Sequence, residues 1–132
     1  MVNTPLEKLL EDKAVTYAVG LNYLHWKMNA LGNKGKPDQL FQAPWGGYLW
    51  IEFKRAGKDP TLLQRYWATQ IVQRRGLVYG CDNYEHAKAI LHNHLDPAAV
   101  PIEGAATYDA AGLRWTIPRP WTGKDIHLFD GI

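Results

Sequence analysis

A strand that carries both an acid and a lysine restricts what this chain can become. Residues 48–54 read Tyr-Leu-Trp-Ile-Glu-Phe-Lys. Side chains alternate between the two faces of an extended strand, so positions 49, 51 and 53 form an apolar face while Glu52 and Lys54 project together from the other. Charged groups on a strand otherwise suited to a core are costly unless they are paired or hold a metal ion. The segment therefore indicates a functional site.

A second acid stands at the start of the preceding strand. Asp38 follows Gly35-Lys36-Pro37 and opens a predicted strand over 38–43, and the turn 44–47 (Pro-Trp-Gly-Gly) leads into the next strand. This pattern predicts a β-hairpin whose first strand begins with an acid and whose second strand ends with the acid–lysine pair.

Length and composition exclude several classes of protein. The chain has 132 residues, which suits one domain, and its formal net charge of +2 allows a polyanionic partner without requiring one. The lone Cys81 excludes an intramolecular disulfide and a cysteine-rich zinc site, and the absence of serine excludes a serine nucleophile. No segment is long and apolar enough to span a membrane, so we expect a cytoplasmic protein with no membrane partner.

Hydrophobic periodicity and capping residues predict an α/β fold with a mixed sheet flanked by helices. The order is α-β-β-β-α-β-α over a core of residues 1–95. Asp59 is the expected cap of the second helix, with Pro60 as its first residue. Residues 96–132 are rich in Pro, Ala and Gly, and we expect an irregular extension with one edge strand near 113–117 that packs on the core or at a dimer interface. The expected elements of the core are helix 5–19, strands 23–28, 38–43 and 48–54, helix 60–75, strand 77–81 and helix 84–94.

The ordered set of motifs resembles the PD-(D/E)xK nuclease superfamily, and most of all its virus-type replication-repair nuclease family, VRR-NUC. The resemblance covers about residues 7–92 and implies a restriction-endonuclease-like core. Each short motif alone is common by chance, whereas the ordered set is more specific. The residues that carry it are Lys27, Gly35-Lys36-Pro37-Asp38, Ile51-Glu52-Phe53-Lys54, Gly57, Leu63-Gln64 and Gly76.

These residue types suit metal-assisted phosphodiester hydrolysis, because carboxylates and carbonyls are the ligands that Mg²⁺ or Mn²⁺ prefers. Asp38 and Glu52 are the expected ligands, with the Phe53 carbonyl, and Lys54 would orient the attacking water and offset developing charge. By the resemblance, Gln64 would hold the geometry of this cluster.

The first helix supplies a further expected acid. Counting back from Lys27, the family's helix acid falls at Glu11, which would reach the metal; Glu7, one turn earlier, is the alternative.

Basic loops on either side of the site are the expected DNA contacts. Lys34 and Lys36 precede Asp38, and Arg55 and Lys58 follow the second acid and its lysine. We expect a DNA endonuclease, with branched or structured DNA implied by the resemblance, working as a homodimer. The alternative is a non-catalytic nucleic-acid-binding or assembly module on the same fold.

Overall fold

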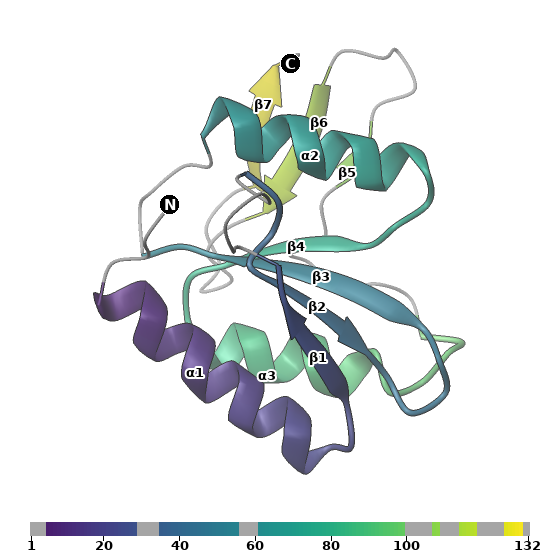
Figure 1. The fold of residues 1–132 in the computed structure, drawn as a ribbon. Coiled ribbons are helices and arrows are strands. Elements are labelled where there is room, and N and C mark those ends of the chain that lie inside the picture. The colour runs from purple at the N-terminus through teal and green to yellow at the C-terminus, as the bar shows by residue number, and fades with distance from the viewer. Residues whose placement is uncertain are drawn as a thin grey trace.

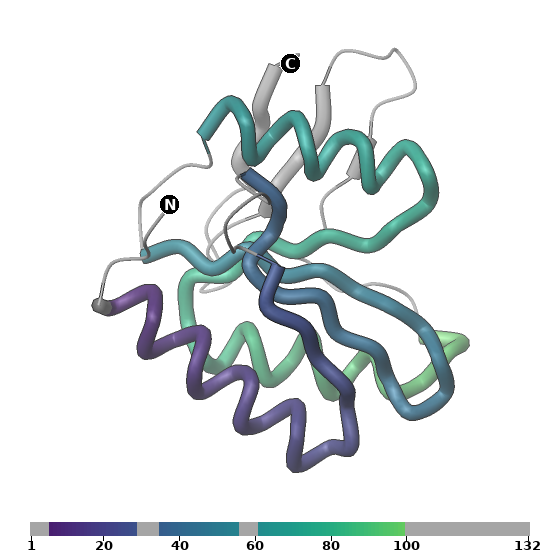
Figure 2. Tube along the Cα trace, viewed as in Figure 1, coloured from purple at the N-terminus to yellow at the C-terminus, as the bar shows by residue number. Residues whose placement is uncertain are grey.

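The computed structural model describes residues 5–28, 35–55 and 61–99, together with the backbone of three short strands near the C-terminus (Figures 1 and 2). Among the described residues, no helix is long and apolar enough to cross a membrane.

A four-stranded mixed sheet forms the centre of the fold, in the strand order β1-β2-β3-β4. The first three strands are antiparallel neighbours and the last pair is parallel, because α2 carries the chain back between β3 and β4. In the hairpin register, Gln39 lies opposite Ile51. The strands are β1 (Leu24–Lys27), β2 (Gln39–Gln42), β3 (Tyr48–Phe53) and β4 (Val78–Cys81).

Three helices cover the two faces of this sheet. Helix α1 (Pro5–Gly20) packs beside α3 (Tyr84–Asn93) under one face, and α2 (Leu62–Gln73) covers the β3–β4 side of the other face (Figure 1). The predicted α/β fold with its mixed sheet and the predicted order of elements are thus confirmed.

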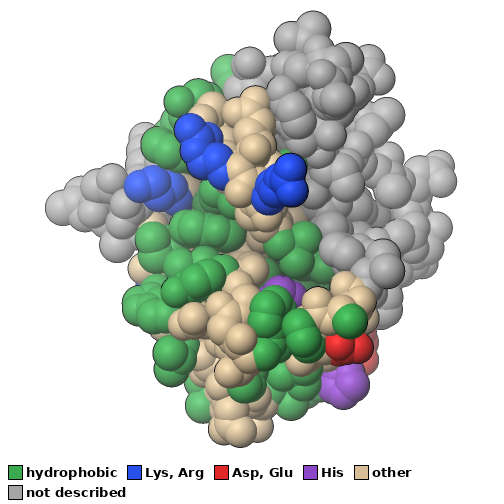
Figure 3. All heavy atoms as spheres, turned by 90° about the vertical axis from the view of Figure 1, so that its right-hand side faces the viewer, with side chains coloured by type: hydrophobic (Ala, Val, Ile, Leu, Met, Phe, Trp, Pro, Cys, Tyr) green, Lys and Arg blue, Asp and Glu red, His purple; other side chains and the backbone are tan. Residues whose placement is uncertain are grey.

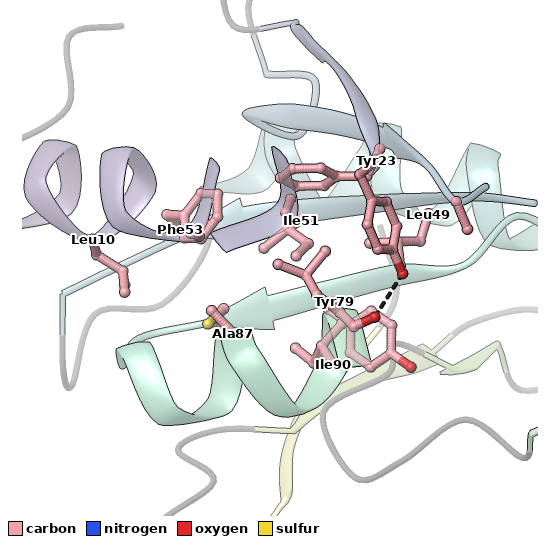
Figure 4. Close-up of a cluster of buried hydrophobic side chains, with 14 residues drawn as sticks. Leu10, Tyr23, Leu49, Ile51, Phe53, Tyr79, Ala87 and Ile90 are labelled. Carbon is pink, nitrogen blue, oxygen red and sulfur yellow. Dashed lines mark hydrogen bonds between the residues drawn. The ribbon is translucent and has the colours of Figure 1, made fainter. Parts of the chain in front are cut away.

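The main core lies between the sheet and the α1–α3 layer. Leu49, Ile51 and Phe53 are fully buried there, as the strand alternation predicts, and Figure 4 shows them pointing toward α1 and α3. The hydroxyl of Tyr23 donates to the Leu91 carbonyl at 2.6 Å, which satisfies a polar group inside this apolar layer (Figure 4).

The far end of the hairpin is tied to the end of α3. The Trp45 Nε1–H group donates to the His94 carbonyl at 2.7 Å, and the two rings lie 5.3 Å apart. A ring nitrogen of His94 lies 3.2 Å from the Gly47 carbonyl. Burial lowers the pKa of His94, which favours the neutral imidazole in this contact.

The start of α2 differs from the sequence prediction. The cap is Thr61 and the first helical residue is Leu62, so the prediction of an Asp59 cap with Pro60 in the first turn is wrong; both of those residues lie outside the described part of the chain. Thr61 and Gln64 form a capping box, in which each side chain accepts from the other residue's backbone N–H group. This reciprocal pair satisfies two N–H groups at the helix start, whereas a cap residue alone satisfies one with its side chain.

The C-terminal part contains more regular structure than expected. A separate antiparallel sheet has the order β5-β6-β7, where β6 (Arg114–Pro118) corresponds to the predicted edge strand. Strands β5 (Thr107–Tyr108) and β7 (Ile126–Asp130) contradict the prediction of an irregular extension with a single strand. Strand β5 contacts α2 and β6 contacts β4, so these short strands depend on pairing and packing that no local pattern encodes.

Candidate active site

Asp38 and Glu52 lie side by side at one end of the hairpin. Gln39 lies opposite Ile51 in the antiparallel register. Asp38, which precedes Gln39, therefore lies opposite Glu52, which follows Ile51. Asp38 is fully buried, and its Oδ2 accepts from the Phe53 N–H group at 2.8 Å. The predicted acid at the strand start and the predicted acid of the next strand are therefore brought together.

Glu52 is a buried carboxylate with an incomplete set of partners. It is 5% exposed, and its Oε2 accepts from Nε2 of Gln64 at 3.0 Å and lies 3.4 Å from Nζ of Lys54. Its Oε1 is buried and has no hydrogen-bond partner. A carboxylate oxygen in this situation lacks the compensation that buried polar groups usually find.

The electrostatics of the site disfavour a second negative charge. Burial raises the pKa of Glu52 well above its ordinary value, and the neighbouring Asp38 charge raises it further, whereas the Lys54 ammonium lowers it. The raised pKa means that the charged form of Glu52 is disfavoured in the folded protein unless positive charge compensates for it.

Lys54 lies on the same face as Glu52, immediately after β3. It is 6% exposed, and its backbone N–H group donates to the Cys81 carbonyl at 2.8 Å, which continues the β3–β4 ladder past Phe53. The ladder thereby fixes the direction in which the ammonium projects.

Gln64 joins the start of α2 to this cluster. Its side-chain carbonyl accepts from the Thr61 N–H group at 2.8 Å, so its amide nitrogen is turned toward Glu52. A shorter or apolar residue could not make both contacts.

The two acids of α1 occupy different surroundings. Glu11 is 2% exposed and binds Nζ of Lys27 at 2.7 and 2.8 Å and Nε2 of Gln39 at 2.5 Å. Glu7 is 5% exposed, accepts from the Arg55 N–H group at 3.1 Å, and its charge contributes to the raised pKa of Glu52. Both carboxylates thus lie on the inner face of α1, with Glu7 toward the end of β3 and Glu11 toward the start of β2.

Two of the four predicted DNA contacts can be placed. Lys36 lies with its Nζ 4.9 Å from the centre of the Trp67 ring, and Arg55 is exposed just beyond β3. Arg55 also lines a cavity of about 330 Å³ beside α1, together with Lys54 and Asp82. Lys34 and Lys58 lie outside the described residues.

Gln39 has a contact that the sequence interpretation missed. It is 4% exposed and points toward α1 with Phe41, where it binds Glu11. The signal was present, because a polar residue stands at an inward position of an alternating strand.

The donor set fits a hard divalent cation. Within the described part of the chain, no group of three or more His, Cys, Asp or Glu side chains is arranged as a metal centre. Mg²⁺ is commonly held by one or two carboxylates, with water and substrate phosphate completing the octahedron. The two buried carboxylates of Asp38 and Glu52 match that requirement, and Oε1 of Glu52 has no hydrogen-bond partner.

No protein-family model and no curated protein matches the sequence. A solved structure titled "VRR_NUC domain" is similar, with a TM-score of 0.62 and 20% identity over 69% of this chain and 99% of that chain. At this identity the likeness concerns the fold. It supports the resemblance found in the sequence and confirms the expected core architecture.

Proposed function

We propose that this protein is a divalent-metal-dependent nuclease that hydrolyses phosphodiester bonds in DNA. The observation that carries the proposal is Glu52, a buried carboxylate beside Asp38 with one oxygen bound by Gln64 and the other without a partner. The fold likeness to a structure titled "VRR_NUC domain" supports the same conclusion.

Asp38 and Glu52 would hold Mg²⁺ or Mn²⁺ together with the Phe53 carbonyl, and Glu11 would assist from α1. When bound, such an ion polarises the scissile phosphate and acidifies water. The Phe53 N–H group donates to Oδ2 of Asp38, which orients this carboxylate beside Glu52.

Lys54 would act on the attacking water and on the phosphate. Its ammonium lies 3.4 Å from Glu52 on the strand face that carries the acid, where it can orient the water and offset charge on the phosphate oxygens. In the reaction, the water oxygen forms a bond to phosphorus, the bond to the leaving oxygen breaks, and the water's proton ends on the leaving group. Gln64 would keep Glu52 in position throughout.

The deciding experiment is incubation of the purified protein with plasmid, linear duplex and four-way-junction DNA, each with Mg²⁺, Mn²⁺ or EDTA. We expect cleavage that requires the metal ion and disappears in the Asp38→Asn variant. Binding without cleavage of any substrate would instead support the non-catalytic nucleic-acid-binding module.

Branched or structured DNA and a homodimer are the finer parts of the proposal. Faster cleavage of the four-way junction than of linear duplex would support the first. Light scattering during size-exclusion chromatography tests the second, and a single-chain mass at assay concentration would contradict it. Residues 96–132 would be the region to truncate if a dimer forms.

A further inference from the structure

A pocket of about 380 Å³ lies between α2 and the sheet, and the proposed metal site does not use it. Its walls come from both layers, with one indole from β3 and another from α2. The lining residues are Lys36, Trp50, Trp67, Gln70, Ile71 and Arg74.

The pocket is adjacent to the proposed site on both of its elements. Trp50 precedes Glu52 by two residues on the same strand face, a separation of about 6–7 Å along the strand. Trp67 follows Gln64 by about one turn of α2. The Trp50–Trp67 pair therefore lies next to the Glu52–Gln64 pair, displaced by two residues along β3 and by about one turn along α2.

The lining combines flat aromatic surfaces with positive charge and contains no acid. Nζ of Lys36 lies 4.9 Å from the Trp67 ring centre, and Nη1 of Arg74 donates to the carbonyl and the side-chain oxygen of Gln70, both at 2.9 Å. Figure 3, which views the side on which α2 ends, shows Lys and Arg side chains above a stretch of hydrophobic side chains.

The loop before β2 fixes this arrangement. Gly35 has φ +87°, and a Cβ there would lie 2.3 Å from Cγ of Leu63 and 3.1 Å from Cδ1 of Trp67. Only glycine allows the loop to pack this closely on α2. The close contact holds Lys36 and Trp67 at one rim of the pocket.

We propose that this pocket binds one unpaired nucleobase of the DNA, at the nucleotide next to the cleaved bond. The base stacks against Trp67, and Lys36 and Arg74 contact the phosphates on either side of it. The inference rests on the proposed nuclease function for the nature of the ligand. It adds that the preferred DNA has an unpaired nucleotide beside the scissile phosphate, because a base inside a duplex remains stacked and cannot enter.

Nucleic acid is favoured over a second copy of this chain by charge. Two cations border the aromatic walls, which complements a polyanion that carries flat bases. The position next to the Glu52–Gln64 pair points the same way, since Trp50 and Trp67 lie on the same two elements as that pair.

The test measures whether binding depends on the base. Fluorescence anisotropy in EDTA gives the dissociation constant of labelled dT12 and of a twelve-residue abasic backbone with the same phosphates. We expect wild-type protein to bind dT12 more tightly, and Trp67→Ala to weaken dT12 binding by about tenfold with little effect on the abasic strand. Trp67→Tyr retains a stacking surface and should restore most of the loss.

Trp45→Ala is the control, since Trp45 is an exposed tryptophan at the hairpin turn, outside the pocket; we expect unchanged binding. Equal affinity of wild-type protein for dT12 and the abasic strand would overturn the inference even if Trp67→Ala fails to fold. Metal-dependent cleavage together with equal affinities would leave the nuclease standing and remove only the pocket. Base-dependent binding without cleavage would support the nucleobase pocket and contradict the nuclease function.

Discussion

The side-chain amide of Gln64 donates to Oε2 of Glu52 at 3.0 Å, while the carbonyl of the same side chain caps the first turn of α2. One residue thus serves the helix and the site. A substitution of Gln64 removes both the helix cap and the contact with Glu52. Comparison with a substitution of Thr61, the other residue of the capping box, separates the two effects.

Gln64→Ala should lower DNA cleavage by about 10- to 100-fold, because Glu52 loses the partner that orients it. It should also destabilise the protein by about 1 kcal/mol. Thr61→Ala removes the other half of the capping box at a similar cost of about 1 kcal/mol, but keeps the amide on Glu52. Cleavage rates and urea unfolding of both variants check this; equal rates for the two would contradict the positioning role.

Glu52→Gln should abolish cleavage and raise the melting temperature at neutral pH in the absence of divalent metal. The folded pKa of Glu52 lies above its ordinary 4.5, so ionisation is easier in the unfolded chain. The stability associated with the protonated form is full below about pH 4.5 and is lost as pH rises through the folded pKa. Melting curves from pH 4 upward should therefore show this loss in wild-type protein and not in the variant. A variant less stable than wild type across this range would refute the prediction.

Lys54→Met should reduce cleavage by at least about a hundredfold while the protein still binds Mg²⁺ or Mn²⁺. Methionine keeps much of the length but removes the charge that lowers the pKa of Glu52, so the pH at which activity appears should also rise. Rate profiles against pH and metal titrations give the readouts. Lys88→Met, on α3, is the control and should leave both unchanged.

Glu11→Gln should cut activity heavily while the fold stays intact, as expected for an acid that reaches the metal from α1. Glu7→Gln should retain most of the rate but move the acidic limb of the pH profile to lower pH, since the Glu7 charge raises the pKa of Glu52. A fully active Glu11→Gln protein would exclude Glu11 from the site. If Glu7→Gln is then inactive, Glu7 is the helix acid.

Neutralising Lys36 and Lys58 together should weaken duplex binding and flatten its dependence on salt. Each lost phosphate contact reduces the slope of log K against log salt by about 0.9. Binding measured at several salt concentrations checks this, with Lys8→Gln, an exposed lysine paired with Asp12 on α1, as the control. An unchanged slope in the double variant would sink the assignment.

The sequence was most informative where a pattern repeats locally. The alternation in β3 correctly predicted which residues enter the core, because a strand's side chains have a period of two. The predicted helix 84–94 corresponds to α3, whose N-cap is Asn83. The start of α2 was misplaced because Asp59 and Thr61 are both good caps, and only the reciprocal contact with Gln64 distinguishes them.

What the sequence could not provide depends on distant contacts. The separate surroundings of Glu7 and Glu11 are set by Arg55, Lys27 and Gln39, which reach α1 only through the folded sheet. Strands β5 and β7 were also missed, although each pairs with β6, their neighbour in sequence. The contacts of β5 with α2 and of β6 with β4 are distant, and the local pattern does not show them.

The hairpin register has a consequence for faithful folding. A slip of one residue between β2 and β3 would invert both faces of the slipped strand, and if β3 slipped, Phe53 would turn outward and Glu52 would enter the apolar layer. The Trp45–His94 contact at one end and the Asp38–Phe53 hydrogen bond at the other oppose that slip. Asp38, which would bind the metal ion, therefore also stabilises the strand alignment in which the site is assembled.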